Sequence, residues 1–172
     1  MPKILSAKDF RSMPWKNGGG VTRELYRLPH PTDPERFSLR LSMAQVAADG
    51  PFSTFPGIDR TLLLIQGAGF RLTFPDQLEV VLDQPLVPLF FAGEDVIQCH
   101  LLAGPCRDFN VMIDREWGEA KTQLTRATEF TAVNRCFVFD IQRDVLVVLN
   151  AGEGWSREES TTVIVVDVGE KN

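Results

Sequence analysis

The chain has 172 residues, of which 44% are hydrophobic and 24% are charged, and its formal net charge is −5. This length and composition are typical of a globular protein with a substantial core. The Lys and Arg residues are scattered singly, so the sequence shows no basic stripe of the kind that binds nucleic acid.

Membrane and secretion signals are missing from the sequence pattern. The N-terminal residues lack an apolar run of signal-peptide length, and the longest apolar runs are too short to span a bilayer. Three cysteines, Cys99, Cys106 and Cys136, are an odd number at irregular spacing, which favours a reducing compartment over a disulfide framework. We therefore expect a cytoplasmic protein without a membrane partner.

Alternation of apolar and polar residues, the signature of β-strands, covers most of the chain. It begins after the glycines at 18–20, where Val21, Arg23 and Leu25 share one face. Turn residues recur about every 8 to 12 positions, which predicts an all-β, antiparallel, cupin-like jelly-roll barrel or sandwich. The later strands are expected at 37–44, 61–65, 69–74, 78–83, 86–91, 96–102, 108–114, 136–141, 144–150 and 161–168.

Helix signals are weak and short. The segments 6–13 and 156–160 could each form one turn, but neither sustains a period of 3.6 residues. Residues 1–172 read as a single domain. The polar segment 115–128 is the one place where a second, smaller β lobe, from about 116 to 172, could begin.

Two of the expected strands carry a polar face opposite an apolar one. These polar sets are Ser38, Arg40 and Ser42 in one strand, and Asp108, Asn110, Met112 and Asp114 in the other. One interpretation is that the polar sets face water, as in many antiparallel sheets. The other is that they line an enclosed ligand cavity, as in barrel-like folds.

The loop before the strand at 61–65 is rich in proline and aromatic residues. It brings Ser53, Asp59 and Arg60 to the mouth of that strand. Stiff loops on a rigid scaffold often carry binding groups. The alternative is that Asp59 and Arg60 form only a local ion pair.

Metal and catalytic motifs are absent from the sequence. The two histidines, His30 and His100, do not form an HxH or HExxH pattern, and the cysteines do not form CxxC. No nucleophile motif or phosphate loop is present. We therefore expect no metal, no cofactor and no identifiable catalytic residue.

Three stretches together resemble the HutD/Ves family of cupin-like proteins: "PWKNGGGVTREL", "GPFSTFPGIDRTLLLIQG" and "DFNVMIDR". The resemblance implies a cupin-like fold described as a bicupin and a link to bacterial histidine utilisation. For the HutD type, the resemblance implies binding of a pathway intermediate such as formylglutamate, whereas the Ves type is associated with stress responses. No activity is firmly attached to the family, and the metal chemistry of ordinary cupins does not carry over.

The resemblance also implies a cavity in this chain. Asn17 and the glycines would form a turn at its mouth with backbone N–H groups open to an anion, while Trp15, Pro56 and Gly57 would serve packing. The expected ligand-binding residues are Asn17, Gly18, Gly19, Thr22, Glu24, Arg40, Ser42, Phe55, Arg60, Asp108, Asn110 and Met112.

Three functions fit these residues. The favoured one is a binding protein whose partner is a small carboxylated metabolite and which regulates histidine degradation. This function is compatible with a homodimer. The second is a metal-independent isomerase or hydrolase that uses Glu24 or Asp108 as a general acid or base. The third is a structural subunit of a larger complex.

Overall fold

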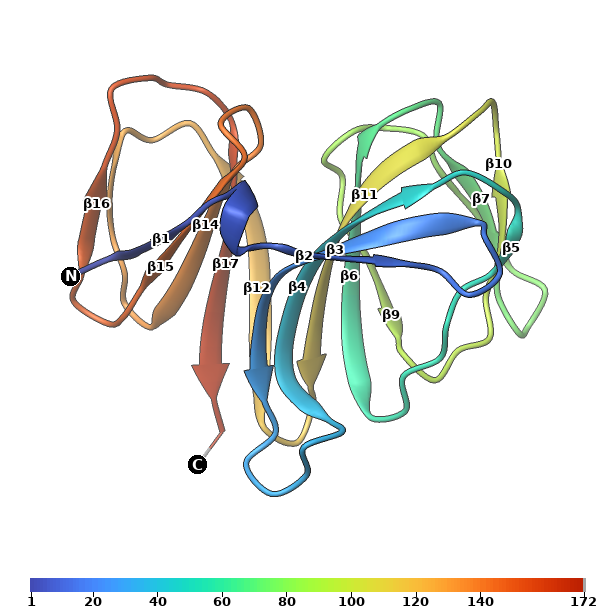
Figure 1. Cartoon of the computed structure of the whole chain (residues 1–172), viewed down its shortest axis with the longest axis horizontal. Coiled ribbons are helices and arrows are strands. Elements are labelled where there is room, and N and C mark those ends of the chain that lie inside the picture. The colour runs from blue at the N-terminus through green and yellow to red at the C-terminus, as the bar shows by residue number, and fades with distance from the viewer. Residues whose placement is uncertain (172) are drawn as a thin grey trace. The chain divides into compact units, whose positions relative to one another are not determined.

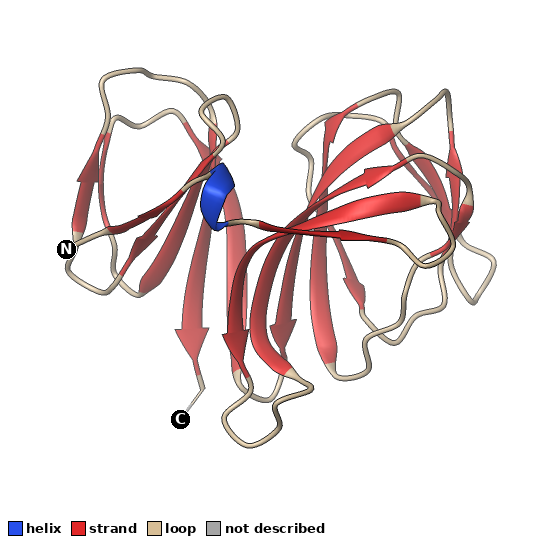
Figure 2. Cartoon of the chain, in the orientation of Figure 1, coloured by secondary structure: helices blue, strands red, loops and turns tan. Residues whose placement is uncertain are grey.

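The computed structural model describes residues 1–171 and consists almost entirely of antiparallel strands, as the sequence predicts (Figure 2). Its backbone divides into two compact units (Figure 1). The larger unit is Arg11–Glu116, and the smaller one combines Met1–Phe10 with the chain from Trp117 onward. In the described part of the chain, no helix is long and apolar enough to span a membrane.

The larger unit contains two sheets. Its six-stranded sheet has the order β2 (Arg11–Pro14), β3 (Gly20–Pro29), β4 (Phe37–Val46), β11 (Cys106–Asp114), β6 (Ile58–Gln66) and β9 (Leu89–Ala92). Its four-stranded sheet has the order β5 (Gly50–Pro51), β10 (Gln98–Leu101), β7 (Phe70–Thr73) and β8 (Glu79–Leu82). Each order has two ends, so neither sheet closes on itself and the unit is a sandwich.

A hydrophobic core joins these two sheets. Leu62 and Leu64 from β6 pack with Phe70 and Leu72 from β7, and Ile97 completes the cluster before β10. All five side chains are fully buried. Burial of this much apolar surface is the dominant stabilising contribution in such a sandwich.

The smaller unit has a core of its own. Its five-stranded sheet has the order β1 (Lys3–Leu5), β15 (Val145–Leu149), β14 (Arg135–Asp140), β17 (Val163–Glu170) and β12 (Gly118–Thr125). A two-stranded sheet pairs β13 (Glu129–Thr131) with β16 (Gly154–Ser156). Cys136, Val138, Val147 and Val165 lie in its hydrophobic cluster.

Several strands lie in segments where the sequence pattern predicts no strand. β2 occupies the end of the segment 6–13, of which only Ala7–Asp9 forms a short 3-10 helix. β12 occupies the polar segment 115–128, and at the edge of its sheet it tolerates polar residues. The segment 156–160 contains no helix.

The polar faces of β4 and β11 are enclosed. Ser38, Ser42, Asp108 and Asn110 are all at most 5% exposed. The interpretation that these faces meet water is therefore wrong for these four residues.

Candidate functional site

The register of the six-stranded sheet places the polar residues of five strands in transverse rows. Residues directly opposite each other on antiparallel strands point to the same face. One such row runs across β3, β4, β11, β6 and β9 and consists of Arg27, Arg40, Met112, Arg60 and Phe91. Residues distant in sequence thereby become neighbours on one face.

Two further rows follow this one on the same face, at successive positions toward the start of β11. The first consists of Arg11, Glu24, Ser42, Asn110 and Leu62. The second consists of Met13, Thr22, Ala44, Asp108 and Leu64.

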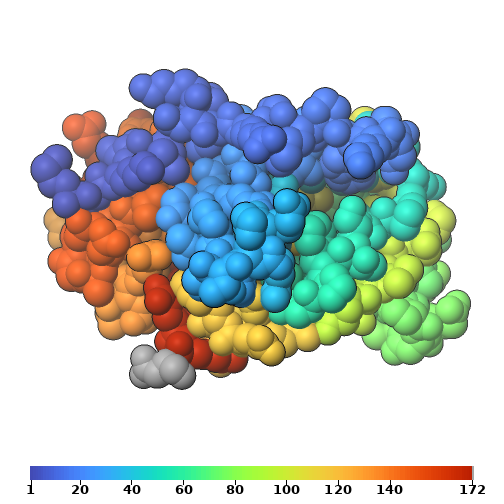
Figure 3. Space-filling view, turned by 60° about the horizontal axis from the view of Figure 1, so that its bottom comes forward, coloured from blue at the N-terminus to red at the C-terminus, as the bar shows by residue number. Residues whose placement is uncertain are grey.

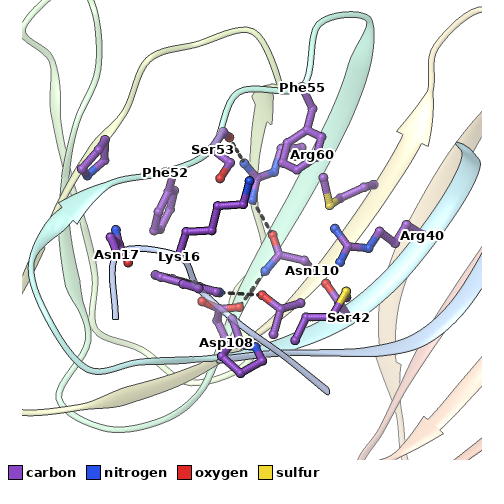
Figure 4. Close-up of a pocket in the computed structure, with 17 residues that line it drawn as sticks. Lys16, Asn17, Arg40, Ser42, Phe52, Ser53, Phe55, Arg60, Asp108 and Asn110 are labelled. Atoms are coloured by element: carbon purple, nitrogen blue, oxygen red, sulfur yellow. Dashed lines mark hydrogen bonds between the residues drawn. The ribbon is translucent and has the colours of Figure 1, made fainter. Parts of the chain in front are cut away.

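The rows open into a cavity of about 560 Å³, which we call the inner cavity (Figure 4). This volume suits a small metabolite. Its lining residues are Met13, Pro14, Trp15, Lys16, Asn17, Thr22, Arg40, Ser42, Ala44, Pro51, Phe52, Ser53, Phe55, Arg60, Asp108, Asn110 and Met112.

Arg60 is the buried cation of the inner cavity, with 8% of its surface exposed. Its Nη2 donates to Asn110 Oδ1 at 2.8 Å and its Nη1 to the Ser53 carbonyl at 3.2 Å (Figure 4). The guanidinium lies 4.9 Å from the ring centroid of Phe91, and its buried Nε has no hydrogen-bond partner among the described residues. Burial lowers the pKa of Arg60 to about 10, so it stays charged at neutral pH.

Asp108 is the buried acid of the same cavity, with 1% of its surface exposed. Asn110 Nδ2 donates to its Oδ1 at 2.6 Å, so Asn110 bridges Asp108 and Arg60. Burial raises the pKa of the Asp108 carboxyl to about 7, although the nearby charge of Arg60 opposes this shift. Near neutral pH, Asp108 can therefore donate or accept a proton.

The β2–β3 turn borders the inner cavity with Trp15, Lys16 and Asn17. The indole Nε1 of Trp15 donates to Thr22 Oγ1 at 2.8 Å, which fixes the ring against the cavity wall. Trp15 therefore lines the cavity, although the sequence indicated only a packing role. Figure 4 shows the Lys16 side chain extending toward Arg60.

The expectation of open backbone N–H groups in this turn is wrong for Gly18 and Gly19. The Gly18 N–H donates to the Trp15 carbonyl at 3.0 Å, and the Gly19 N–H donates to Asn17 Oδ1 at 2.8 Å. Gly18 has a φ of +73°, which glycine adopts without strain. These glycines close the turn, and neither lines the inner cavity.

Glu24 does not line the inner cavity but pairs with a residue that does. Its Oε2 accepts from Arg40 Nε at 2.8 Å, and both side chains are largely buried. Glu24 instead lines a neighbouring outer cavity of about 1040 Å³, which Arg40 and Phe55 also line.

The local ion pair considered for Asp59 and Arg60 is not formed. Asp59 Oδ1 accepts from Arg115 Nε at 2.9 Å, and Arg115 also binds Glu94. Neighbours along a strand point to opposite faces, so Asp59 faces away from the cavity that Arg60 enters.

The structure thus brings most of the expected ligand-binding residues to one cavity. Asn17, Thr22, Arg40, Ser42, Phe55, Arg60, Asp108, Asn110 and Met112 line it, whereas Gly18, Gly19 and Glu24 do not. Ser53, which the sequence places at a strand mouth, also lines it, and the lining residues that the sequence did not single out for binding are Met13, Pro14, Trp15, Lys16, Ala44, Pro51 and Phe52. Most of them belong to two of the three recognised stretches, and that is the signal that could have found them.

Potential metal ligands do not gather anywhere in the described residues. No three His, Cys, Asp or Glu side chains lie close enough together to hold a metal ion. The donors that do converge are guanidinium and amide groups, which suit an anionic organic ligand.

Comparison with known proteins places the chain in a family. The sequence profile of the HutD family matches residues 7–167. The chain belongs to the HutD family. Its relatives include an uncharacterised 21.2 kDa protein in the hutC 3′ region of Pseudomonas putida, 39% identical over 70% of this chain. Protein Ves of Escherichia fergusonii is 35% identical over 74% of this chain.

The curated relatives are matched over only part of their length. The match covers 63% of the Pseudomonas putida protein and 67% of Ves. A solved structure that matches from end to end is HutD from Pseudomonas fluorescens SBW25, described as a formate condition, which is 28% identical with a TM-score of 0.85 and full coverage of both chains. The iron enzyme HppE is 12% identical over 64% of this chain with a TM-score of 0.50, which is a likeness of fold only.

Proposed function

We propose that this protein binds a small carboxylated or formylated metabolite in the inner cavity, and that binding regulates histidine utilisation. The observation that carries the proposal is Arg60, a buried guanidinium with no carboxylate of the described residues within 4.0 Å. A buried charge is costly unless it is paired, so an anionic ligand is its natural partner.

The rest of the inner cavity complements such a ligand. Arg40 uses only its Nε for Glu24, which leaves its Nη groups for a second contact. Phe52 and Phe55 supply apolar walls, and Asn110 and Asp108 can meet an amide or formyl group. Membership of the HutD family and a relative in the hutC 3′ region support histidine utilisation as the setting. Formylglutamate, which combines carboxylates with a formyl amide, is the candidate ligand.

Calorimetric titration with formylglutamate tests this proposal, with formate as the minimal probe. We expect the wild type to bind, and Arg60→Leu to bind at least tenfold more weakly, because a hydrogen bond to a charged group contributes about 1.5–3 kcal/mol. Arg71→Leu is the matched control, since Arg71 is exposed on β7 and lines neither cavity.

The melting temperature separates binding from folding. If Arg60→Leu lowers stability while the folded fraction binds formylglutamate unchanged, Arg60 is structural and the proposed site is wrong. If no histidine-pathway intermediate binds the wild type at millimolar concentration, the metabolite hypothesis itself is abandoned.

The second candidate function is a metal-independent isomerase or hydrolase of the same metabolites. It is favoured by Asp108, a cavity-lining acid whose pKa burial raises to about 7, near the value that suits a general acid or base. NMR of formylglutamate incubated with the protein distinguishes the two functions. Turnover that Asp108→Asn abolishes supports the enzyme, whereas binding without turnover supports the regulator.

A further inference from the structure

A second, larger hollow lies beside the inner cavity and has a distinct composition. The outer cavity has a volume of about 1040 Å³, and its wall includes Arg11, Arg27, Arg36, Phe37 and Pro56. In Figure 3 the light-blue β3–β4 hairpin and the cyan segment before β6, which supply most of these residues, lie side by side at the surface (Figure 3). The two cavities share Met13, Arg40 and Phe55, so they lie next to each other with these three side chains at their common border.

Three arginines stand in one row across both cavities. Arg27 and Arg40 are direct Cα partners on β3 and β4, and Arg60 lies two strands further along the same row. Neighbouring strands are about 4.8 Å apart, so the row from Arg27 to Arg60 spans roughly 14 Å at the backbone. Like charges directly opposite each other destabilise a sheet, and although water reaches the exposed Arg27, an anionic group beside the row relieves this repulsion.

The protein itself supplies only part of that counterpart. Glu24 pairs with Arg40. Arg27 donates through Nη2 to the carbonyls of Arg36 at 3.2 Å and Glu35 at 3.5 Å, and its guanidinium lies 5.4 Å from the Phe37 ring centroid. Neither Arg27 nor Arg60 has a carboxylate within 4.0 Å in the described chain.

Arg36 shows the contrasting case in the same wall. Its Nη2 lies 2.8 Å from the buried carboxylate of Asp114, so its charge is already matched. Arg27 is held in place by carbonyls and an aromatic ring instead, which orient a guanidinium without neutralising it. A preorganised and unneutralised guanidinium is well suited to bind an external acidic group.

We infer that the two cavities are subsites of one elongated site, and that the outer subsite at Arg27 and Arg40 binds a second acidic group of the ligand. The ligand class is therefore an extended molecule with two separated acidic ends, not a monocarboxylate. One end meets Arg60 and the other meets Arg27 and the free Nη groups of Arg40. This inference rests on the proposed function, because it assumes that Arg60 binds the first acidic group.

Simple acids of matched length provide the test. Calorimetry on the full chain compares hexanoate and octanoate with adipate and suberate, the diacids with the same carbon numbers. We expect each diacid to bind at least tenfold more tightly than the monoacid with the same carbon number. For succinate we expect a smaller gain in affinity over its own monoacid, because its two acidic ends are closer together.

Two variants assign the gain to the outer subsite. Arg27→Gln is expected to weaken suberate binding at least fivefold and leave octanoate unchanged. Glu24→Gln releases Arg40 from its partner and is expected to tighten suberate binding while octanoate again stays unchanged. Arg71→Gln, the control for loss of one distant positive charge, is expected to change neither.

The outcomes separate this inference from the proposed function. If monoacids bind in an Arg60-dependent manner but diacids gain nothing, the elongated site is wrong and the proposed function stands. If neither class of acid binds, the proposed function fails as well. Should Arg27→Gln not fold, Glu24→Gln decides, and an unchanged ratio of diacid to monoacid affinity in that variant overturns the inference.

Discussion

At the scale of single residues, Asn110 is the amide that makes two buried ionisable groups compatible. Its Oδ1 accepts from Arg60 and its Nδ2 donates to Asp108, so both neighbours gain a hydrogen bond without touching each other. A buried polar group needs such a partner because leaving it unpaired costs about 1–3 kcal/mol. The arrangement leaves Arg60 without a direct carboxylate partner among the described residues, although the charge of nearby Asp108 acts on it.

Asp108 makes the stability of the protein depend on pH. Its folded-state pKa of about 7 lies above the ordinary value of 3.8. The folded state therefore holds the proton more tightly than the unfolded state, and this contribution to stability is fully present below about pH 4 and lost as pH rises through 7. The charge of Arg60 acts on Asp108 directly, and the charge of Arg40 acts on Arg60. Lys16 also lines the cavity, and the Cys99 thiol lies near enough to respond to the charge of Asp108.

Asp108→Asn removes this titration while keeping a similar side-chain shape. We expect the variant to be more stable than the wild type at pH 8, and the gap to close toward pH 5, because a neutral amide needs no buried charge. The change should be on the order of 2–4 kcal/mol across that range. Urea unfolding at several pH values measures it, and parallel curves for the two proteins would contradict the raised pKa.

At the scale of elements, the β2–β3 turn holds one wall of the inner cavity in place. Its closing residue, Gly20, has no room for a side chain: an added Cβ would lie 2.5 Å from the Gln45 carbonyl oxygen and 3.0 Å from the Trp15 ring. The run of glycines thus has two separate causes, since Gly18 needs a positive φ and Gly20 needs a close backbone approach.

Gly20→Ala tests this close approach. We expect a loss of about 1–3 kcal/mol in the free energy of unfolding, because the backbone or Trp15 must shift to admit the methyl group. For a chain of this length, the melting temperature should fall by roughly 2–4 °C per kcal/mol. Gly50→Ala is the control, since a Cβ there meets nothing within 4 Å. Equal melting temperatures for the two variants would show that the turn adjusts freely.

The same elements show how far the sequence predicts the molecule. Alternation correctly identified β4 and β11, and a short continuous apolar run identified β6. It could not identify β2 or β12, which lie at sheet edges and are largely exposed. The alternation pattern also could not predict the hydrogen-bond partner of Arg60, because strand register, not sequence distance, brings Asn110 beside Arg60.

At the scale of the whole molecule, the inner and outer cavities both belong to one of the two units. Every lining residue of the inner and outer cavities lies within Arg11–Glu116. The smaller unit contributes its own sheets and its own core. The family profile nevertheless spans both, from residue 7 to residue 167, so both units belong to the family's shared fold.

The charge of the inner cavity leads to a last prediction, about metal. Many cupin-like proteins hold a metal through histidines, but Arg40, Arg60 and Lys16 line this cavity and would repel a divalent cation. Its one carboxyl, Asp108, is half protonated near neutral pH, and a metal ligand must be deprotonated. We therefore expect purified protein to carry less than about 0.1 equivalent of Zn, Fe or Mn, and its melting temperature to be unaffected by EDTA. Elemental analysis against the dialysis buffer measures the content. About one metal per chain that resists the chelator, lost in Asp108→Asn, would show that the cavity binds a cation after all.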